Sequence, residues 1–193
     1  AYDDDPVAHD DQMLPENRAP SAIKCAFIGI GGGGGKLAKA FLDLGYTKTL
    51  LINTTVKDQP EGVPPEHFLL LPGADGVGKD ISLGKKVLEN NSASVEDTLR
   101  TRVGKADWLF VLAGGGGGTG SACHVLHESL ERYLKSVGAS GKIVYVVTKP
   151  SSQELLNPTI SSNYESLSED VALHPHILID NEKQLQILRG KVG

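Results

Sequence analysis

Two runs of five glycines constrain this chain more than any other feature of its sequence. They occupy residues 31–35 and 114–118, and each follows a short apolar segment and precedes apolar residues at helical spacing. With glycine at roughly 7% of residues, five in succession are expected about once in a million windows. A flexible linker usually carries serine and other polar residues on both sides. The pattern therefore predicts, twice, a strand followed by a bare loop and a helix.

A loop of this kind is suited to binding phosphate. Five glycines leave no side chain over the backbone amides, and the helix that follows adds unpaired N–H groups and the positive end of its dipole. Phosphate groups bind at such places. Because the chain has a formal net charge of −5, we expect amides rather than basic side chains to hold most of the phosphate.

The composition predicts an ordinary soluble protein with one domain and an acidic tail. The 193 residues are 39% hydrophobic and 22% charged, which is enough to bury one sizeable core. We expect a disordered acidic tail over residues 1–20 and a folded domain over residues 21–193. The net charge argues against direct binding to nucleic acid or to a membrane surface. The chain has neither an apolar run of about 18 residues nor a secretory signal at its start, so a cytoplasmic location is expected.

The cysteines and histidines do not predict a metal site. Cys25 and Cys123 lie in segments that we expect to be buried, outside any metal-ligand spacing, and are predicted to be reduced packing residues. His124 and His127 lie three apart on a predicted helix, but a third ligand is not apparent near them in the sequence. We expect ordinary histidines on a helix surface and no metal ion held by the protein.

The order of segments predicts an α/β fold. Apolar runs predict buried strands at residues 23–30, 49–53, 67–71, 108–113, 142–148 and 177–179. Helical spacing predicts a helix after the first glycine run and others over residues 81–89, 95–103, 122–137, 160–172 and 181–188. Gly45 is placed to end the first helix, and Ser94 is a suitable N-cap for the helix over residues 95–103. We expect a three-layer, Rossmann-like α/β fold with helices on both faces of a mostly parallel sheet.

Three glycine-rich loops, the two glycine runs and residues 72–80, follow predicted strands. They should meet at the edge where open parallel sheets bind ligands, which indicates a nucleotide. The segment from Gly29 to Gly34 satisfies the dinucleotide fingerprint, but a glycine run satisfies almost any glycine pattern. The second strand ends in Asn53, where a dinucleotide site usually has a carboxylate. A Rossmann oxidoreductase is thus a weaker alternative, and the phosphate-loop pattern fails because Leu37 follows the Gly-Lys pair.

Six segments resemble, in the same order along the chain, the nucleotide-binding segments of the tubulin and FtsZ superfamily, with FtsZ as the most similar branch. They are Ile28 to Gly34, Ile52-Asn53-Thr54, Gly76-Val77-Gly78-Lys79-Asp80, the tubulin signature loop Gly116 to Ser121, Val147 to Pro150 with Glu154, and the guanine-reading segment Ile179 to Lys183. Taken in order, they extend over about residues 23–188.

This resemblance implies a GTP-binding cytoskeletal protein that assembles with copies of itself into head-to-tail filaments, with GTP at the junction between subunits and adaptor proteins on the tails. Gly76 and Gly78 would approach the terminal phosphate, Glu154 would bind ribose, and Asn181 would bind guanine. The residues implied to bind GTP or GDP with Mg²⁺ are Gly31, Gly32, Gly33, Lys36, Asn53, Thr54, Gly76, Val77, Gly78, Gly114, Gly115, Gly116, Gly117, Gly118, Thr119, Gly120, Pro150, Glu154 and Asn181.

Three positions depart from the pattern of the FtsZ branch. Lys36 stands where that branch commonly has asparagine near the base, Thr55 where it commonly has aspartate, and Pro158 where it commonly has arginine near the ribose. The contacts to base and ribose are therefore expected to differ from those of the branch. Asp75 and Asp80 are candidates to assist Mg²⁺ through water or to cap their loop.

The resemblance also predicts where the catalytic groups come from. The family continues into a long central helix, an acidic loop and a second domain, whereas this chain stops at Gly193. We expect the second domain to be absent from this chain and assign it no catalytic residue. A neighbouring subunit would supply the acidic loop that polarises the attacking water, so hydrolysis would be coupled to polymerisation. A nucleotide-binding interaction module without hydrolysis is the alternative.

Overall fold

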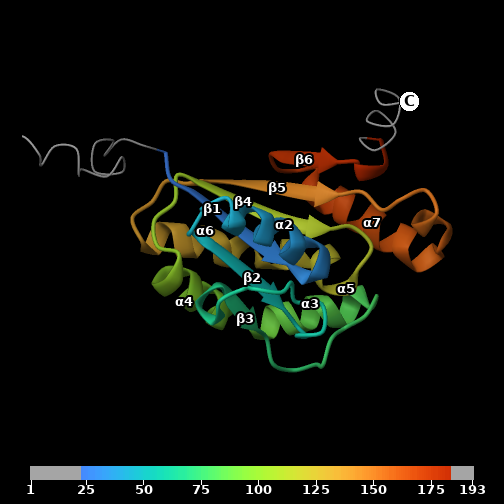
Figure 1. Cartoon of the computed structure of the whole chain (residues 1–193), viewed down its shortest axis with the longest axis horizontal. Helices are drawn as coiled ribbons and strands as arrows, with labels where there is room; N and C mark the ends of the chain where they lie inside the picture. The colour runs from blue at the N-terminus through green and yellow to red at the C-terminus, as the bar shows by residue number, and fades with distance from the viewer. Residues whose placement is uncertain (1–22, 184–193) are drawn as a thin grey trace, which may run out of the picture.

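Six parallel strands form one sheet in the computed structural model, which describes residues 23–183 (Figure 1). The strands are β1 (Cys25–Ile30), β2 (Thr49–Asn53), β3 (Phe68–Leu70), β4 (Trp108–Gly114), β5 (Lys142–Thr148) and β6 (His176–Ile179). The helices are α2 (Gly31–Asp43), α3 (Ile81–Asn90), α4 (Ser92–Arg102), α5 (Gly118–Ser121), α6 (His127–Ser136) and α7 (Pro158–Val171), with 3₁₀ turns η2 (Pro65–His67), η3 (Cys123–Leu126) and η4 (Glu154–Leu156). The predicted α/β fold class is confirmed.

The sheet reverses its winding direction between β1 and β4. Its strand order is β3-β2-β1-β4-β5-β6, so the chain runs outward from β1 to one edge and then outward from β4 to the other. Ile30 pairs with Ala113 at the carboxyl ends of these two central strands. The two glycine runs therefore leave the sheet side by side, at the topological switch point where open parallel sheets bind ligands.

Two hydrophobic cores lie on opposite faces of the sheet. The larger core joins alternate residues of β1, β2, β4 and β5 to α3, α4, α6 and α7 and includes the fully buried Tyr133 and Tyr145. The smaller core joins Phe27, Leu51 and Leu112 to α2, where Phe41 stacks on Phe27 with ring centroids 4.0 Å apart. Helices on both faces were predicted, and within the described residues α2 is the helix of the second face (Figure 1).

The first glycine run differs from its prediction as a bare loop, because α2 begins at Gly31 and the whole run is helical. A methyl group placed on Gly34 would lie 2.1 Å from the carbonyl oxygen of Leu112, and one on Gly29 would lie 2.3 Å from the carbonyl oxygen of Gly34. The first turn of α2 thus rests directly on the backbone of β1 and β4, where only glycine fits. Close packing, and not only access for a ligand, accounts for this run.

Two predicted helix boundaries are also wrong. The helix predicted over residues 122–137 is divided into α5, η3 and α6, because hydrogen bonds from the amides of Ala122 and Val125 reach back three residues and tighten this part of the chain. The N-cap of α4 is Asn91 and not Ser94. The helix predicted from residue 181 is present as far as residue 183; its remainder and the predicted tail over residues 1–20 lie outside the described residues.

Both cysteines are free thiols, as predicted, but their burial differs. Cys123 is fully buried in the larger core, whereas Cys25, at the start of β1, is half-buried. Burial raises the pKa of both thiols, and that of Cys123 to about 12. None of the helices within residues 23–183 combines the length and apolarity needed to span a membrane.

The alkaline stability of the fold should depend on Tyr133. Its hydroxyl donates a hydrogen bond to the carbonyl of Gly104, and burial raises its pKa from 10.0 to about 12. The folded state keeps this proton at pH values where an unfolded tyrosine loses it. The stabilisation is therefore complete below about pH 10 and is lost as the pH rises through about 12. Urea unfolding at pH 9 and pH 11 should show a smaller decline for Tyr133→Phe than for the wild type; equal declines would contradict this assignment.

Candidate functional site

A cavity of about 810 Å³ lies at the carboxyl ends of the strands. This volume is in the range of pockets that bind small molecules and cofactors, roughly 300–1,000 Å³. Its walls come from the residues that follow β1, β2, β4, β5 and β6 and from the loop before α3. Every residue predicted from the sequence to bind nucleotide lines this cavity, except Gly116.

The two glycine runs contact each other and form the floor of the cavity. A methyl group on Gly33 would lie 3.0 Å from the Cα of Gly114, and one on Gly31 would lie 2.9 Å from the amide nitrogen of Gly120. Gly117 is different, because no heavy atom lies within 4 Å of the position its Cβ would take. The backbone at the floor is thus closely packed from below and open toward the cavity.

The amides of α2 are the main source of positive potential in the cavity. The N-cap of α2, Ile30, provides no side-chain hydrogen bond, and the first turn of this helix has no acidic residue. The charged side chains around the cavity balance one another: Lys36, Lys57 and Lys149 against Asp58, Glu61 and Glu154. An anion would therefore be attracted mainly by the unpaired N–H groups and the dipole of α2.

The segment Ile52-Asn53-Thr54 is held against the signature loop, Gly116 to Ser121, by a buried polar contact. Asn53 is the last residue of β2, and its side-chain oxygen accepts a hydrogen bond of 2.8 Å from the amide of Thr54, the next residue. The hydroxyls of Thr54 and Thr119 are 3.1 Å apart, and both residues are buried. This contact fixes the start of α5 relative to the end of β2 and so sets the width of the cavity at this point.

The loop at residues 72–80 closes the cavity on one side. Gly76 and Gly78 have φ angles of +82° and +58°, which favour glycine. The amide of Gly76 donates a hydrogen bond of 2.9 Å to Thr54, and the amide of Gly118 donates one of 2.9 Å to Gly78. The loop at residues 72–80 is thereby tied to the residue after β2 and to the second glycine run, and its Val77 lies on the cavity wall.

Asp75 and Asp80 do not line the cavity. The side chain of Asp80 caps α3 by accepting a hydrogen bond of 3.0 Å from the amide of Leu83. Asp75 lies 3.5 Å from the Nζ of Lys57, and both side chains are largely exposed. The loop-capping prediction holds for Asp80, whereas neither carboxylate is placed beside the cavity to assist a magnesium ion.

The opposite wall is formed by residues that follow β5 and β6. Pro150, Glu154 and Asn181 line it together with Lys149. A carboxylate oxygen of Glu154 accepts a hydrogen bond of 3.1 Å from the amide of Ser151, which holds this side chain in its own turn. Lys36 faces the same cavity from the second turn of α2. Polar side chains at this wall can distinguish ligands in a way that the glycine floor cannot.

Several cavity residues were not among those assigned to nucleotide binding from the sequence. Ile30, Thr148 and Lys149 lie within segments that carry the resemblance, Thr55 is one of the positions that depart from the FtsZ pattern, and the others are residues 57–61. The last group belongs to the connection between β2 and β3, which has no helical or strand period that could place it. Gly116 is the converse case: its amide donates to the Ser121 hydroxyl, so this glycine shapes the loop without facing the cavity.

Asn163 is a further residue that sequence reasoning missed. It lies on α7, is 3% exposed, and its side-chain amide donates hydrogen bonds to the carbonyl oxygens of Lys79 (2.8 Å) and Gly116 (3.0 Å). One side chain thereby joins two of the glycine loops from outside the cavity. The sequence shows only an asparagine within a helical pattern. It does not reveal the partners of this side chain, which are 84 and 47 residues away in the chain.

Replacing Asn163 by alanine should loosen both loops. The change leaves two carbonyl groups without their partner, which costs roughly 2–3 kcal/mol of unfolding free energy. Urea unfolding measures this loss, and hydrogen exchange should increase in residues 72–80 and 114–118. The exposed Asn90 provides the control, since Asn90→Ala should change stability by less than about 0.5 kcal/mol. Unchanged exchange in the two loops would contradict the role given to Asn163.

Comparison with known proteins finds tubulin-like and FtsZ relatives of this chain. No family model matches it. It is 36% identical over 111 residues to the tubulin-like protein CetZ2 of Haloferax volcanii, covering 51% of this chain and 30% of that protein. It is 25% identical over 167 residues to the cell division protein FtsZ 1 of Pyrococcus horikoshii, covering 83% of this chain and 42% of that protein.

Solved structures agree with these relatives. CetZ from Methanosaeta thermophila superimposes with a TM-score of 0.74 at 24% identity, covering 87% of this chain and 49% of that one. CetZ2 from Haloferax volcanii, solved as a protofilament bound to GTPγS, superimposes with a TM-score of 0.69 at 27% identity, covering 83% and 50%. The chain spans half or less of the length of each of these relatives. These similarities support membership of the tubulin/FtsZ superfamily.

Proposed function

We propose that this chain is the GTP-binding domain of a self-assembling cytoskeletal protein, with the domain occupying residues 21–193. The observation that supports it most is convergence: residues from six separate segments, predicted from the sequence to bind nucleotide, line one cavity, with the single exception of Gly116. Among the relatives, CetZ2 has been solved with bound GTPγS. A nucleoside triphosphate fits a cavity of about 810 Å³ whose floor consists of backbone amides.

In this proposal the glycine floor holds the phosphates. The amides of Gly31 to Gly33, and those of Gly117, Thr119 and Gly120 at the start of α5, donate to the phosphate oxygens, and each hydrogen bond to a charged group contributes about 1.5–3 kcal/mol. Glu154 accepts from the ribose and Asn181 hydrogen-bonds the guanine. Lys36, which lines the same cavity, adds a positive charge that the FtsZ branch commonly lacks there.

The residues around the cavity fit a magnesium ion that is held mainly by the nucleotide itself. Mg²⁺ keeps several waters and usually takes only one or two protein carboxylates besides phosphate oxygens. Asp58 and Glu61 are the carboxylates on the cavity wall nearest in sequence to β2, whereas Asp75 and Asp80 are engaged elsewhere. When bound, the ion would neutralise phosphate charge.

A titration with fluorescent GTP tests the ligand. Binding should be saturable, require Mg²⁺ for full affinity, and be displaced by GTP and GDP much better than by ATP or NAD. Preference for NAD would contradict the proposal and favour a dinucleotide enzyme. Failure of all four nucleotides to bind a folded chain would contradict it as well.

We further propose that hydrolysis depends on assembly into cytoplasmic, head-to-tail filaments of the same protein. The cavity lies at one edge of the sheet, where an adjoining subunit can cover it and supply the carboxylates that polarise water. Several relatives have been solved as protofilaments or filaments, including TubZ of Bacillus thuringiensis.

Turnover per subunit of a longer chain that includes the family's acidic loop, measured over a hundredfold range of protein concentration, tests this dependence, with light scattering to follow assembly. The rate per subunit should be very low when the chain is dilute and should rise once assembly begins. Turnover that is independent of concentration would contradict assembly-dependent hydrolysis while leaving GTP binding intact.

A further inference from the structure

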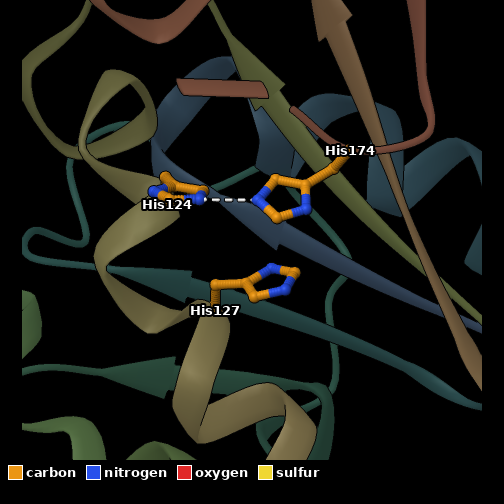
Figure 2. A group of neighbouring side chains, drawn as sticks. All are labelled: His124, His127 and His174. Carbon is orange, nitrogen blue, oxygen red and sulfur yellow. Dashed lines mark hydrogen bonds between the residues drawn. The ribbon is translucent and has the colours of Figure 1, made fainter. Parts of the chain in front are cut away.

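Three histidines from two distant parts of the chain meet away from the nucleotide cavity (Figure 2). His124 belongs to η3, His127 is the first residue of α6, and His174 lies in the connection between α7 and β6. All three side chains are half-buried, and one nitrogen from each lies within 4.8 Å of the others. From the sequence, His124 and His127 were predicted to be ordinary helix-surface histidines without a third ligand nearby. The structure adds His174, 50 residues after His124, to form a cluster that the sequence does not reveal.

The rings are arranged around a shared space. The Nε2 atoms of His124 and His174 face each other at 2.8 Å, as Figure 2 shows, so one of the two carries a proton and the other directs a lone pair at it. The ring of His127 stacks on that of His174, with centroids 4.1 Å apart. Each of the three imidazole rings therefore has the other two as its nearest ring neighbours.

We propose that His124, His127 and His174 form a binding site for a divalent transition-metal ion, with Zn²⁺ as the best-suited ion. Imidazole nitrogen is a preferred ligand of zinc, and three histidines with an open fourth position are an established zinc environment. Tetrahedral coordination with bonds of 2.0–2.1 Å places ligand nitrogens about 3.3 Å apart. The ion would replace the proton shared by His124 and His174. The ring of His127 would move by about 1 Å to become the third ligand.

The surroundings of the cluster favour this role. The hydroxyl of Tyr145 lies 2.7 Å from Nδ1 of His127, which is the kind of partner that orients a ligating histidine through its other nitrogen and leaves Nε2 for the ion. The carboxylate of Glu131 lies 3.5 Å from that Nε2 and adds negative charge beside the site. Burial lowers the pKa of both His124 and His127.

The site also has an entry path and a structural consequence. His127, His174 and Glu131 line a second cavity of about 430 Å³, through which an ion can reach the cluster. A bound ion would join the start of α6 to the connection that leads into β6, which are otherwise linked by side-chain contacts. Because the unfolded chain does not hold the three rings together, binding should stabilise the fold. This site is independent of the proposed GTP site.

The test is calorimetric titration of the 193-residue chain with Zn²⁺, with visible absorption of Co²⁺ as a second probe. We expect one ion per chain, a Co²⁺ spectrum of tetrahedral type, a higher unfolding temperature with Zn²⁺, and reversal by a chelator. His124→Gln and His174→Gln should each weaken Zn²⁺ binding at least tenfold. The matched control is His176→Gln, which alters an exposed histidine two residues from His174 and should leave binding unchanged. Mg²⁺ should have no effect on the site, because it prefers oxygen ligands.

Equal Zn²⁺ affinity in wild type and His174→Gln would overturn the proposal, as would the absence of binding at micromolar Zn²⁺. If a variant fails to fold, histidine side-chain NMR of the wild type decides instead. Zn²⁺ should shift the ring nitrogens of three of the six histidines, those that also show the contacts expected for His124, His127 and His174. Shifts confined to other histidines would overturn the assignment.

Discussion

The Gly34→Ala variant should lose more than about 3 kcal/mol of unfolding free energy, a large effect for the addition of one methyl group. That methyl would lie 2.1 Å from the carbonyl oxygen of Leu112 and 3.2 Å from the carbonyl carbon of Gly29. Both contacts are with backbone of the central strands, so no side chain can rotate aside. Helix α2 would have to lift off the sheet, and with it one half of the floor of the nucleotide cavity. Urea unfolding measures the loss.

The neighbouring Gly35 provides a matched control for this prediction. A methyl group there would lie 3.5 Å from a methyl carbon of Leu51, which is an ordinary packing distance. Because alanine is favoured over glycine within a helix by roughly 0.5–1 kcal/mol, Gly35→Ala should be neutral or stabilising. Equal unfolding midpoints for the two variants would contradict the close packing of α2 on β1 and β4.

The Gly117→Val variant should keep its fold and lose its affinity for GTP. Gly117 has φ −79° and ψ 162°, which valine adopts readily, and no heavy atom lies within 4 Å of its Cβ position. Since Gly117 lines the cavity, the new side chain would cover amides that we assign to the phosphates. Loss of one or two such hydrogen bonds, at about 1.5–3 kcal/mol each, lowers affinity by roughly ten- to a thousandfold or more.

Fluorescent GTP titration and urea unfolding, carried out on the same preparation, separate the two effects. Gly35→Ala is again the control, because this glycine belongs to the other run but does not line the cavity. An unchanged GTP affinity in a folded Gly117→Val protein would show that the signature loop does not hold the phosphates. A variant that unfolds would contradict the open space observed above Gly117.

Much of the fold follows from local patterns. The six strands were predicted within about two residues of their observed positions because buried parallel strands appear as short apolar runs. The glycine loops were placed at the carboxyl ends of strands for the same reason. The boundaries of α4 and of the α5 to α6 segment were wrong, since capping and 3₁₀ winding there depend on hydrogen bonds that periodicity does not record.

The sequence by itself determined the α/β class, the order of its elements and the meeting of the glycine-rich loops at one edge, because these depend on short-range spacing and on the rule that parallel strands end at a common edge. The individual residues assigned to the cavity came from the resemblance to the tubulin and FtsZ superfamily. Only the tertiary structure decided that the first glycine run is helical, that Asn163 joins two loops, and that His174 meets His124 and His127. Each of these depends on backbone or side chains that are far apart in the chain and are brought together by packing on the sheet. No local pattern specifies such contacts.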